Sequence, residues 1–200
     1  MEETEGIVLK CLEYKDRERI ITVFTKENGL VSLIVKGVWA GSHDKLSATT
    51  PFCQAQYIFK RGRSDLLRYH ESSILYEHLE LRSHYSHLEA AGLMAKTLLD
   101  SQLPGRPSHA LYALFERCLK QIPHFSHPQT LTSSFLLKML LLEGLISHEE
   151  SDIPHLTPAE HELFRELTFG RSFQKLAQLQ VPPELAQKVQ AHFSSRIHQN

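Results

Sequence analysis

Residues 19–36 read RIITVFTKENGLVSLIVK, and this stretch decides the fold class of the first part of the chain. Two runs rich in β-branched residues, Arg19–Thr25 and Leu30–Lys36, flank the residues Lys26-Glu27-Asn28-Gly29. β-branched side chains fit the pleated surface of a strand, and Asn-Gly tolerates the positive φ values that a tight turn needs. The stretch therefore predicts a β-hairpin.

Further strand patterns surround this hairpin. Gly6–Leu12 precedes it, and Phe52–Phe59 and Leu66–Ser73 follow it after Gly37–Thr50, which we interpret as a loop. Short alternating runs with turn residues between them are typical of a small barrel. Five strands in about 75 residues match an OB-type barrel, in which closure removes exposed sheet edges.

After Tyr76 the apolar residues recur at helical spacing. A first helix is expected to end at Leu103-Pro104-Gly105, and a second to stop at Pro123, because proline cannot continue the hydrogen-bond ladder. A third, from about Leu131 to Gly144, is apolar on nearly all sides and is therefore expected in the centre of a helical bundle.

Thr157-Pro158-Ala159-Glu160 predicts the start of a further helix, with Thr157 as N-cap and Glu160 closing a capping box. Two or three shorter helices follow, separated near Gly170 and at Pro182-Pro183. The sequence thus predicts an α+β protein, in which a five-stranded OB-fold barrel over residues 1–76 is followed by an α-helical domain over residues 77–200.

Composition places the chain among ordinary globular proteins. It has 200 residues, 42% hydrophobic and 22% charged, which is enough apolar material for a packed core. An acidic N-terminus without a long apolar run does not resemble a signal peptide, so we expect a cytoplasmic protein. The cysteines Cys11, Cys53 and Cys118 form no C-x-x-C pair, which favours buried free thiols over a metal site.

Charge is unevenly placed, although the formal net charge is only −1. Residues 10–68 hold eleven basic and six acidic residues, a net charge of +5. Basic side chains on a barrel suit the binding of a nucleic-acid backbone, because they displace counterions from phosphates. The candidate phosphate contacts are Lys10, Arg17, Arg19, Lys36, Lys45, Arg61, Arg63 and Arg68.

Aromatic side chains would supply faces on which bases stack. The candidates are Trp39, Tyr14, Tyr57 and Tyr69. The simpler interpretation is that the charges form the solvated face of a small barrel, with Arg17 and Arg19 paired to Asp16 and Glu18. Composition leaves both interpretations open.

Enzymatic chemistry has no positive signal. Thirteen histidines invite a metal or catalytic interpretation, but none belongs to H-E-x-x-H or to a Cys/His zinc spacing. The sequence also has no G-x-S-x-G elbow, P-loop or G-x-G-x-x-G after a strand. No catalytic residue, metal ligand or cofactor is therefore predicted.

Several motifs resemble those of the RecO family of DNA-repair proteins. The opening Gly6–Lys10, the hairpin Ile20–Gly29 and the pair Lys36-Gly37 resemble that family's G-I-V-L strand, I-x-T-x-F-T-x-E-x-G hairpin and K-G motif. Pro51-Phe52 resembles its L-x-P-F segment, and Phe135–Gly144 its F-x-x-K-L-L-x-x-x-G helix. The resemblance covers about residues 6–144.

This resemblance implies an OB-fold and a helical domain that act without enzymatic chemistry in the recombinational repair of gapped DNA. It implies binding of single- and double-stranded DNA and annealing of complementary strands. The implied protein partners are RecR, the acidic C-terminal tail of single-strand-binding protein and, indirectly, RecA. Lys36 is the first choice for a phosphate contact because it matches the K-G motif.

Two features depart from the family. Many members carry four zinc-binding cysteines after the helix that Phe135–Gly144 resembles, whereas residues 145–200 contain no cysteine. The segment Val38–Lys45 also has little of the basic charge usual after the K-G motif, which shifts weight to Trp39 and to the turn at Lys60–Arg63.

Two other functions stay open at this point. One is a protein-only adaptor whose barrel and bundle both dock other proteins, as the near-zero net charge permits. The other is a hydrolase that uses one of the histidines, which would need a concave site gathering histidine with carboxylates or a metal.

Overall fold

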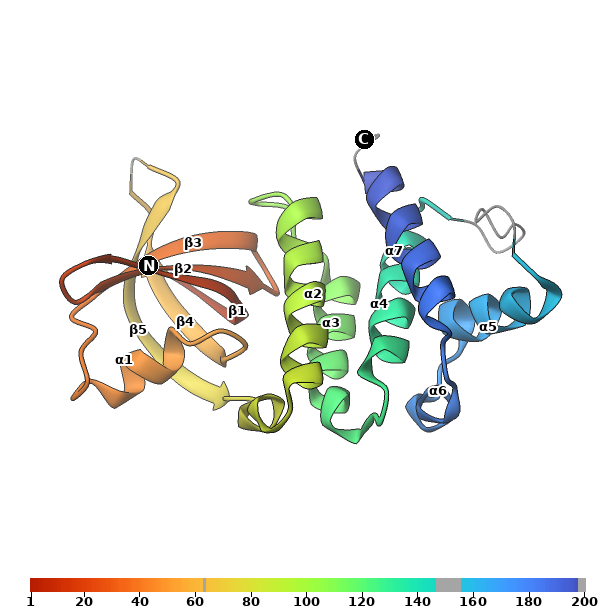
Figure 1. Ribbon diagram of the computed structural model, residues 1–200. Coiled ribbons are helices and arrows are strands. Elements are labelled where there is room, and N and C mark those ends of the chain that lie inside the picture. The colour runs from red at the N-terminus through yellow and green to blue at the C-terminus, as the bar shows by residue number, and fades with distance from the viewer. Residues whose placement is uncertain (63, 147–155, 198–200) are drawn as a thin grey trace. The chain divides into compact units, whose positions relative to one another are not determined.

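Five strands close into a barrel in the N-terminal part of the chain (Figure 1). Their order around the barrel is β1-β2-β3-β5-β4, and β4 pairs back onto β1. All neighbours are antiparallel except β3 and β5, which run parallel over a short stretch. This is the topology of an OB-fold, as predicted. The strands are β1 (Glu2–Lys15), β2 (Glu18–Thr25), β3 (Gly29–Lys36), β4 (Gln54–Lys60) and β5 (Leu66–Tyr76).

This computed structural model describes residues 1–62, 64–146 and 156–197, which form two compact units. The barrel unit holds Met1–Leu79 together with Ala95–Glu116. The helical unit holds Glu80–Met94 and Arg117–Asn200. The boundary predicted between residues 76 and 77 therefore ignores a helical segment, 95–116, that clusters with the barrel.

β1 is longer than predicted and belongs to two strand pairs. Its first residues, Glu2 to Ile7, pair with β4, and its later residues, Gly6 to Lys15, pair with β2. Register shifts after Val8 and after Glu13 mark irregularities that bend the strand. The bend lets one strand close the barrel.

The β2–β3 hairpin is confirmed. The strands pair from Glu18 with Lys36 to Thr25 with Gly29, and Gly29 has a φ of 67°. The Thr25 hydroxyl accepts from the Asn28 backbone N–H at 3.1 Å and donates to the Gly29 carbonyl at 2.7 Å, which closes the turn.

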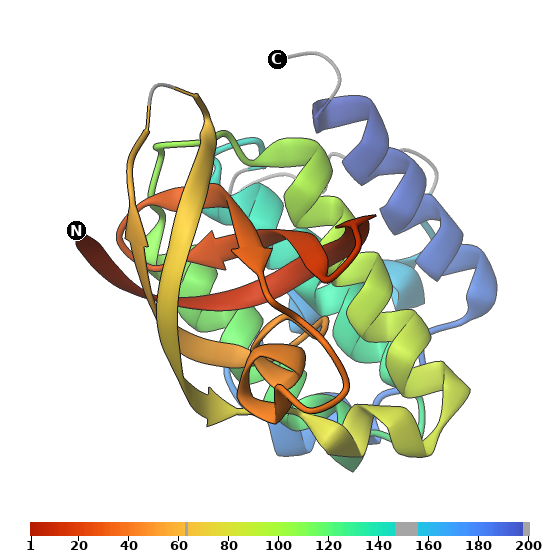
Figure 2. The ribbon, with the colours of Figure 1, turned by 90° about the vertical axis from the view of Figure 1, so that its left-hand side faces the viewer.

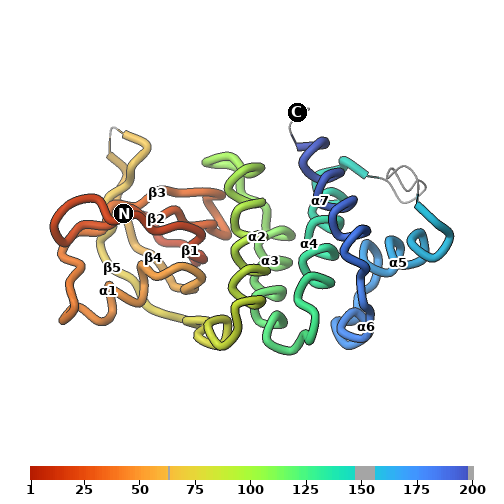
Figure 3. Tube along the Cα trace, viewed as in Figure 1, coloured from red at the N-terminus to blue at the C-terminus, as the bar shows by residue number. Residues whose placement is uncertain are grey.

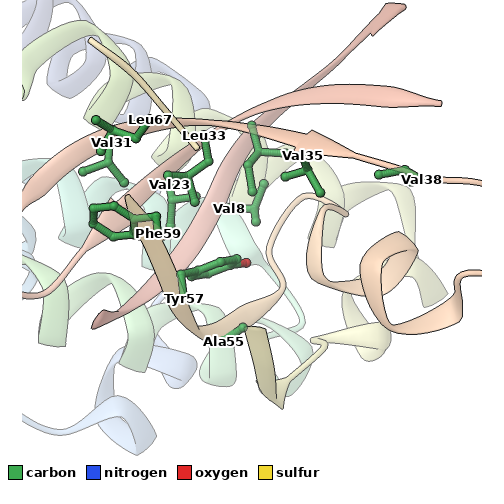
Figure 4. Packing of buried hydrophobic residues seen from close by; sticks show 11 residues of the cluster. Val8, Val23, Val31, Leu33, Val35, Val38, Ala55, Tyr57, Phe59 and Leu67 are labelled. Carbon is green, nitrogen blue, oxygen red and sulfur yellow. The ribbon is translucent and has the colours of Figure 1, made fainter. Parts of the chain in front are cut away.

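Alternate residues of the strands fill the barrel. Figure 4 shows Phe59 and Tyr57 from β4 facing Val8, Val23 and Leu33 from the other strands. Eleven buried side chains form this core, and nearly all are aliphatic or aromatic. They are Val8, Ile21, Val23, Val31, Leu33, Val35, Val38, Ala55, Tyr57, Phe59 and Leu67.

The segment predicted as a loop, Gly37–Thr50, contains a short helix, α1 (His43–Ala48). Figure 2 looks onto the barrel and shows α1 in orange, with β4 and β5 in yellow tones. The buried Tyr57 hydroxyl donates to the Ala48 carbonyl at 2.7 Å. The apolar periodicity was too short to reveal this helix, which tertiary contacts stabilise.

Residues 95–116 pack on the outside of β1 and β2. The Phe24 ring packs against Tyr112 in a tilted arrangement and against Phe115 edge to face, at ring-centroid distances of 5.8 and 6.5 Å. Beside them, the Gln54 amide donates to Glu5 at 2.6 Å and to Glu116 at 3.0 Å. This end of the outer barrel surface is therefore covered.

The helices end and begin near the predicted signals. Thr157 caps α5 in a complete capping box with Glu160, as predicted, and Pro128 begins the third predicted helix three residues earlier than expected. The helices are α2 (Tyr85–Ser101), α3 (His109–Gln121), α4 (Pro128–Leu142), α5 (Pro158–Phe169), α6 (Phe173–Gln178) and α7 (Pro183–Ile197). Two short 3₁₀ segments lie at Leu79–Ser83 and Ile122–His124.

α4 is the centre of the helical unit, and α5, α6 and α7 pack against it (Figure 3). Three polar side chains of α4, spaced four residues apart, bond to carbonyls at or near the ends of its neighbours. Thr130 donates to Leu179 at 3.1 Å, Ser134 to Leu167 at 2.6 Å, and Lys138 to Gly170 at 2.6 Å. Helix-end carbonyls lack intrahelical partners, so these bonds stabilise the packing of α5 and α6.

No helix in the described ranges is long and apolar enough to cross a membrane.

Both the backbone conformation and the lack of space exclude a side chain at Gly29. Its φ is +67°, and a Cβ there would lie 2.7 Å from the Arg106 carbonyl oxygen. We expect Gly29→Ala to lower the free energy of unfolding by about 2 kcal/mol, measured by urea unfolding with circular dichroism.

Two alanine variants serve as controls. Gly105 shares the positive φ but a Cβ there would meet nothing within 4 Å, so Gly105→Ala isolates the backbone strain. Gly62 has open space and no positive φ, and its variant should be as stable as the parent. A Gly29→Ala variant as stable as Gly62→Ala would contradict this account.

Candidate nucleic-acid interface

The outer face of the barrel carries an apolar row where strand alternation would place polar side chains. Leu12, Ile20 and Ile34 are aligned across β1, β2 and β3, and Arg68 of β5 continues the same row. Their strand neighbours Ile21 and Leu33 point into the core, so the row points outward. Leu12 is 49% exposed, and Ile20 and Ile34 are half-buried.

Mostly polar residues border this row. On one side Lys10, Thr22, Ser32 and Leu66 form the next row, and Lys10 is exposed. Lys36 lies at the end of β3 on the other side. The face therefore combines an aliphatic centre with cationic edges.

An open hollow of about 600 Å³, which we call the basic hollow, adjoins the row at β3 and β5. Lys36, Lys45 and Arg68 all line it, so the structure brings together three of the predicted phosphate contacts. In the described part of the chain no aspartate or glutamate lines this hollow. Its remaining lining residues are Ile34, Ser64, Leu66, Tyr69 and His70.

The three cations are held differently. Lys45 donates from Nζ to the Lys36 carbonyl at 2.9 Å, which fixes its position without neutralising its charge. Arg68 is exposed on β5 and, among the described residues, has no carboxylate within ion-pair distance. Lys36 pairs with Glu18, with Nζ and Oε1 3.1 Å apart.

Arg19 is the predicted contact that is least available to a ligand. Its guanidinium donates to Thr49 Oγ1 at 2.9 Å and lies 3.8 Å from Glu13, and its side chain is only 20% exposed. Thr49 is the C-cap residue of α1. Arg19 therefore joins α1 to the barrel, and its acidic neighbour is Glu13, whereas the simpler charge-pairing interpretation expected Asp16 or Glu18.

The other predicted residues lie around the rim of the barrel. Arg17 is exposed in the β1–β2 turn, with a φ of 61°. Arg61 is exposed at the end of β4, where its Nε donates to Glu2 Oε1 at 2.5 Å. Arg63 lies outside the described residues.

Of the four aromatic candidates, two are available for stacking. Trp39 is 56% exposed in the loop before α1, and Tyr14 is 52% exposed near the end of β1. Tyr69 is half-buried, and its hydroxyl lies 2.9 Å from Ser72 Oγ. Tyr57 was predicted wrongly, because it is fully buried in the barrel core.

Sequence reasoning missed the apolar row itself. Ile20-Ile21 and Leu33-Ile34-Val35 are continuous apolar runs in strands that otherwise alternate, and such runs signal that both faces of a strand are apolar. That signal was present in the sequence. The alignment of Leu12 with these residues required the strand register.

The family is decided by comparison with known proteins. Residues 1–77 match the family model described as "Recombination protein O N terminal". The chain is 32% identical over 154 residues to a DNA repair protein RecO of Chlamydia pneumoniae, covering 77% of this chain and 58% of that protein. Residues 1–77 belong to the N-terminal family of RecO, and the chain as a whole is similar to RecO proteins.

Other RecO proteins match as well. The chain is 26% identical over 149 residues to that of Moorella thermoacetica, covering 74% of this chain and 55% of the relative. It is 23% identical over 219 residues to that of Chlamydia trachomatis serovar L2, covering 95% and 90%. The alignments thus span little more than half the length of the first two relatives and most of the third.

The zinc site of many RecO proteins does not fit the residues of this chain. Cys53 and Cys118 are buried, Cys11 is half-buried, and none follows α4. Burial raises the pKa of the Cys118 thiol to about 12, which disfavours the thiolate that binds zinc. Within the described ranges no group of three or more His, Cys, Asp and Glu residues could hold a metal ion.

The helical unit has a hollow of its own, of about 580 Å³, between the start of α2, α4 and α7. Ala90, Leu93 and Leu136 give it apolar walls. Its polar lining consists mainly of serine, threonine and glutamine side chains, with Glu89 and His127. The hollow can therefore hold an apolar segment with neutral polar neighbours.

The two arginines beside the β1–β2 turn allow a matched test of the structural role of Arg19. We expect Arg19→Ala to lower the free energy of unfolding by about 1–2 kcal/mol, because it removes a partly buried bond to the α1 cap. Arg17→Ala should change it by less than about 0.5 kcal/mol, since the Arg17 side chain is exposed. Thermal unfolding measures both, and equal effects would rule out the role of Arg19 in holding α1.

Proposed function

We propose that this chain binds single-stranded DNA on the outer face of its barrel. On that basis it acts in DNA repair as a recombination mediator that anneals strands and assists the loading of RecA at gaps. The mechanism is to hold and present strands, and no bond is made or broken. RecR is the proposed partner of the mediator step.

One observation carries the proposal: the outward apolar row of Leu12, Ile20 and Ile34 lies beside a hollow lined by three cations and no described carboxylate. Cations at the edge of the sheet attract phosphates, and the apolar centre accepts the faces of bases. Bases are accessible in this way in a single strand and stacked away in a duplex. The face therefore favours single-stranded over double-stranded DNA, while duplex would contact the cations alone.

The hollow of the helical unit supports a second part of the proposal, docking of the C-terminal tail of single-strand-binding protein. Peptide recognition of this kind depends on a few apolar anchors in a groove. Leu93 and Leu136 offer such walls. No lysine or arginine is among the described lining residues, so the contact would rest on apolar side chains rather than on charge pairing with the acidic tail.

The first test is the salt dependence of DNA binding. With about four phosphate contacts to a single strand, affinity should fall roughly 50-fold between about 50 and 200 mM salt. Fluorescence anisotropy with a labelled mixed-sequence oligonucleotide measures this. Arg68→Ala should reduce the slope of log affinity against log salt by about 0.7, whereas Arg165→Ala, an exposed arginine of α5, should leave it unchanged.

Two results would decide against the proposal. Absence of binding at about 50 mM salt would favour the protein-only adaptor, the alternative that near-zero net charge permits. An unchanged slope in Arg68→Ala would remove the basic hollow from the interface.

The apolar row predicts a loss of affinity that does not change the salt dependence of binding. Leu12→Ala should weaken binding of a single strand about fivefold and leave the salt slope unchanged, because the leucine contacts bases and displaces no counterion. Leu142→Ala is the matched control, since Leu142 is 47% exposed at the end of α4 and Leu12 is 49% exposed. Equal effects of the two variants, or a changed slope in Leu12→Ala, would exclude base contact at the row.

A further inference from the structure

Glu18 lies between two lysines at one end of the outer face. The strand register places Lys15 of β1 and Lys36 of β3 directly opposite it on either side. Side chains opposite each other on antiparallel strands lie on the same face and interact. The row therefore alternates in charge: positive, negative, positive.

Only one of the two lysines is paired with Glu18. Lys36 Nζ lies 3.1 Å from Glu18 Oε1, whereas Lys15 Nζ lies over the Tyr14 ring, 5.2 Å from its centroid. The Glu18 side chain is 17% exposed and that of Lys36 is 71% exposed. The carboxylate is thus the fixed member of the pair, and the ammonium is the member that can swing into solvent.

The basic hollow thus contains two kinds of cation. Arg68 and Lys45 keep their full charge, because no described carboxylate is within ion-pair distance of either. Lys36 lines the same hollow but is neutralised by Glu18. A phosphate that enters the hollow can bind Arg68 and Lys45 without displacing a carboxylate. To bind Lys36, it must compete with Glu18.

We propose that Glu18 is an intramolecular competitor for the DNA phosphate at Lys36. This inference rests on the proposed binding of DNA by the outer face. When the Lys36 ammonium turns to a phosphate, Glu18 exchanges to Lys15, its other cross-strand neighbour. This exchange keeps the negative charge of Glu18 paired with a lysine, and it makes the contact between Lys36 and the phosphate reversible.

Arg61 shows the same arrangement at the end of β4. Its Nε donates to Glu2 Oε1, and Glu2 Oε2 also accepts from Asn28 Nδ2 at 3.4 Å. Glu2 therefore keeps a bond when Arg61 turns away. Two of the predicted phosphate contacts, Lys36 and Arg61, thus pair with a carboxylate that would compete with a phosphate, and Glu2 already has a second partner whereas Glu18 has a second lysine opposite it.

Competition has a consequence for salt dependence. A phosphate bound to an unpaired cation releases a counterion from DNA without disturbing any ion pair of the protein. A phosphate that displaces Glu18 from Lys36 releases the same counterion but also frees the Glu18 carboxylate. This carboxylate then binds either a cation from solution or the Lys15 ammonium. The parent protein should therefore bind more weakly, and with a flatter salt slope, than a variant without the carboxylate.

The test is Glu18→Gln in the full chain, with the labelled single strand at several salt concentrations. The amide keeps the size of the side chain and removes its charge. We expect binding three- to fivefold tighter at about 50 mM salt, the range given by a surface ion pair, and a salt slope steeper by up to about 0.7. Glu3→Gln is the matched control, because Glu3 is exposed on the same strand as Lys15 and has no ion-pair partner among the described residues.

A double variant separates competition from general repulsion. In a Lys36→Ala background the lysine for which Glu18 and the phosphate compete is absent, so Glu18→Gln should tighten binding less than twofold. The same gain in both backgrounds, or a gain equal to that of Glu3→Gln, would overturn the competition. A parent that binds DNA while Glu18→Gln binds it equally well overturns this inference alone, and failure of both proteins to bind at low salt overturns the proposed function as well.

Discussion

β1 pairs with two strands at once, and the barrel depends on this double pairing. Residues Glu2 to Ile7 bond to β4 and residues Gly6 to Lys15 to β2, and an irregularity follows the overlap, after Val8. A strand that bends in this way removes the open edges that a flat sheet would present. Closure then gives each strand an inner face, which the core fills, and an outer face, which is available for function.

One end of that outer face is covered by other residues of the barrel unit, and the other end is more exposed. Phe24 and its neighbours are covered by residues 95–116 of the same unit, whereas Leu12, Ile20 and Ile34 stay exposed or half-buried. Apolar side chains left outside a core signal a binding surface when they gather in one row. The cations beside this row are the reason why we propose nucleic acid as the ligand of the face, with an affinity that their differing ion pairs adjust.

Polar side chains of the central helix α4 hold the packing of the helical unit. Thr130, Ser134 and Lys138 lie along one face of α4 and bond to carbonyls at or near the ends of α5 and α6. Lys138 is largely buried, and burial lowers its pKa, yet it is bonded to a carbonyl rather than left unpaired. Hydrogen bonds from a central helix thus help to fix the shorter helices packed against it.

The sequence by itself determined the local elements. The Asn28-Gly29 turn, the capping box at Thr157 and the burial of α4 all follow from neighbouring residues, so their prediction needed no knowledge of the fold. α1 and the full length of β1 were missed, because a six-residue helix and a bent strand are stabilised by contacts with distant segments. For the candidate site, the sequence identified the cations but not which of them are ion-paired or buried.

Only the tertiary structure decided which of those cations are available. It placed Arg19 against α1 and Lys36 against Glu18, left Arg68 without an ion pair to any described carboxylate, and buried Tyr57. It also aligned Leu12 with Ile20 and Ile34. The physical reason is that strand register joins residues far apart in the chain, and a shift of one residue would turn every side chain to the opposite face.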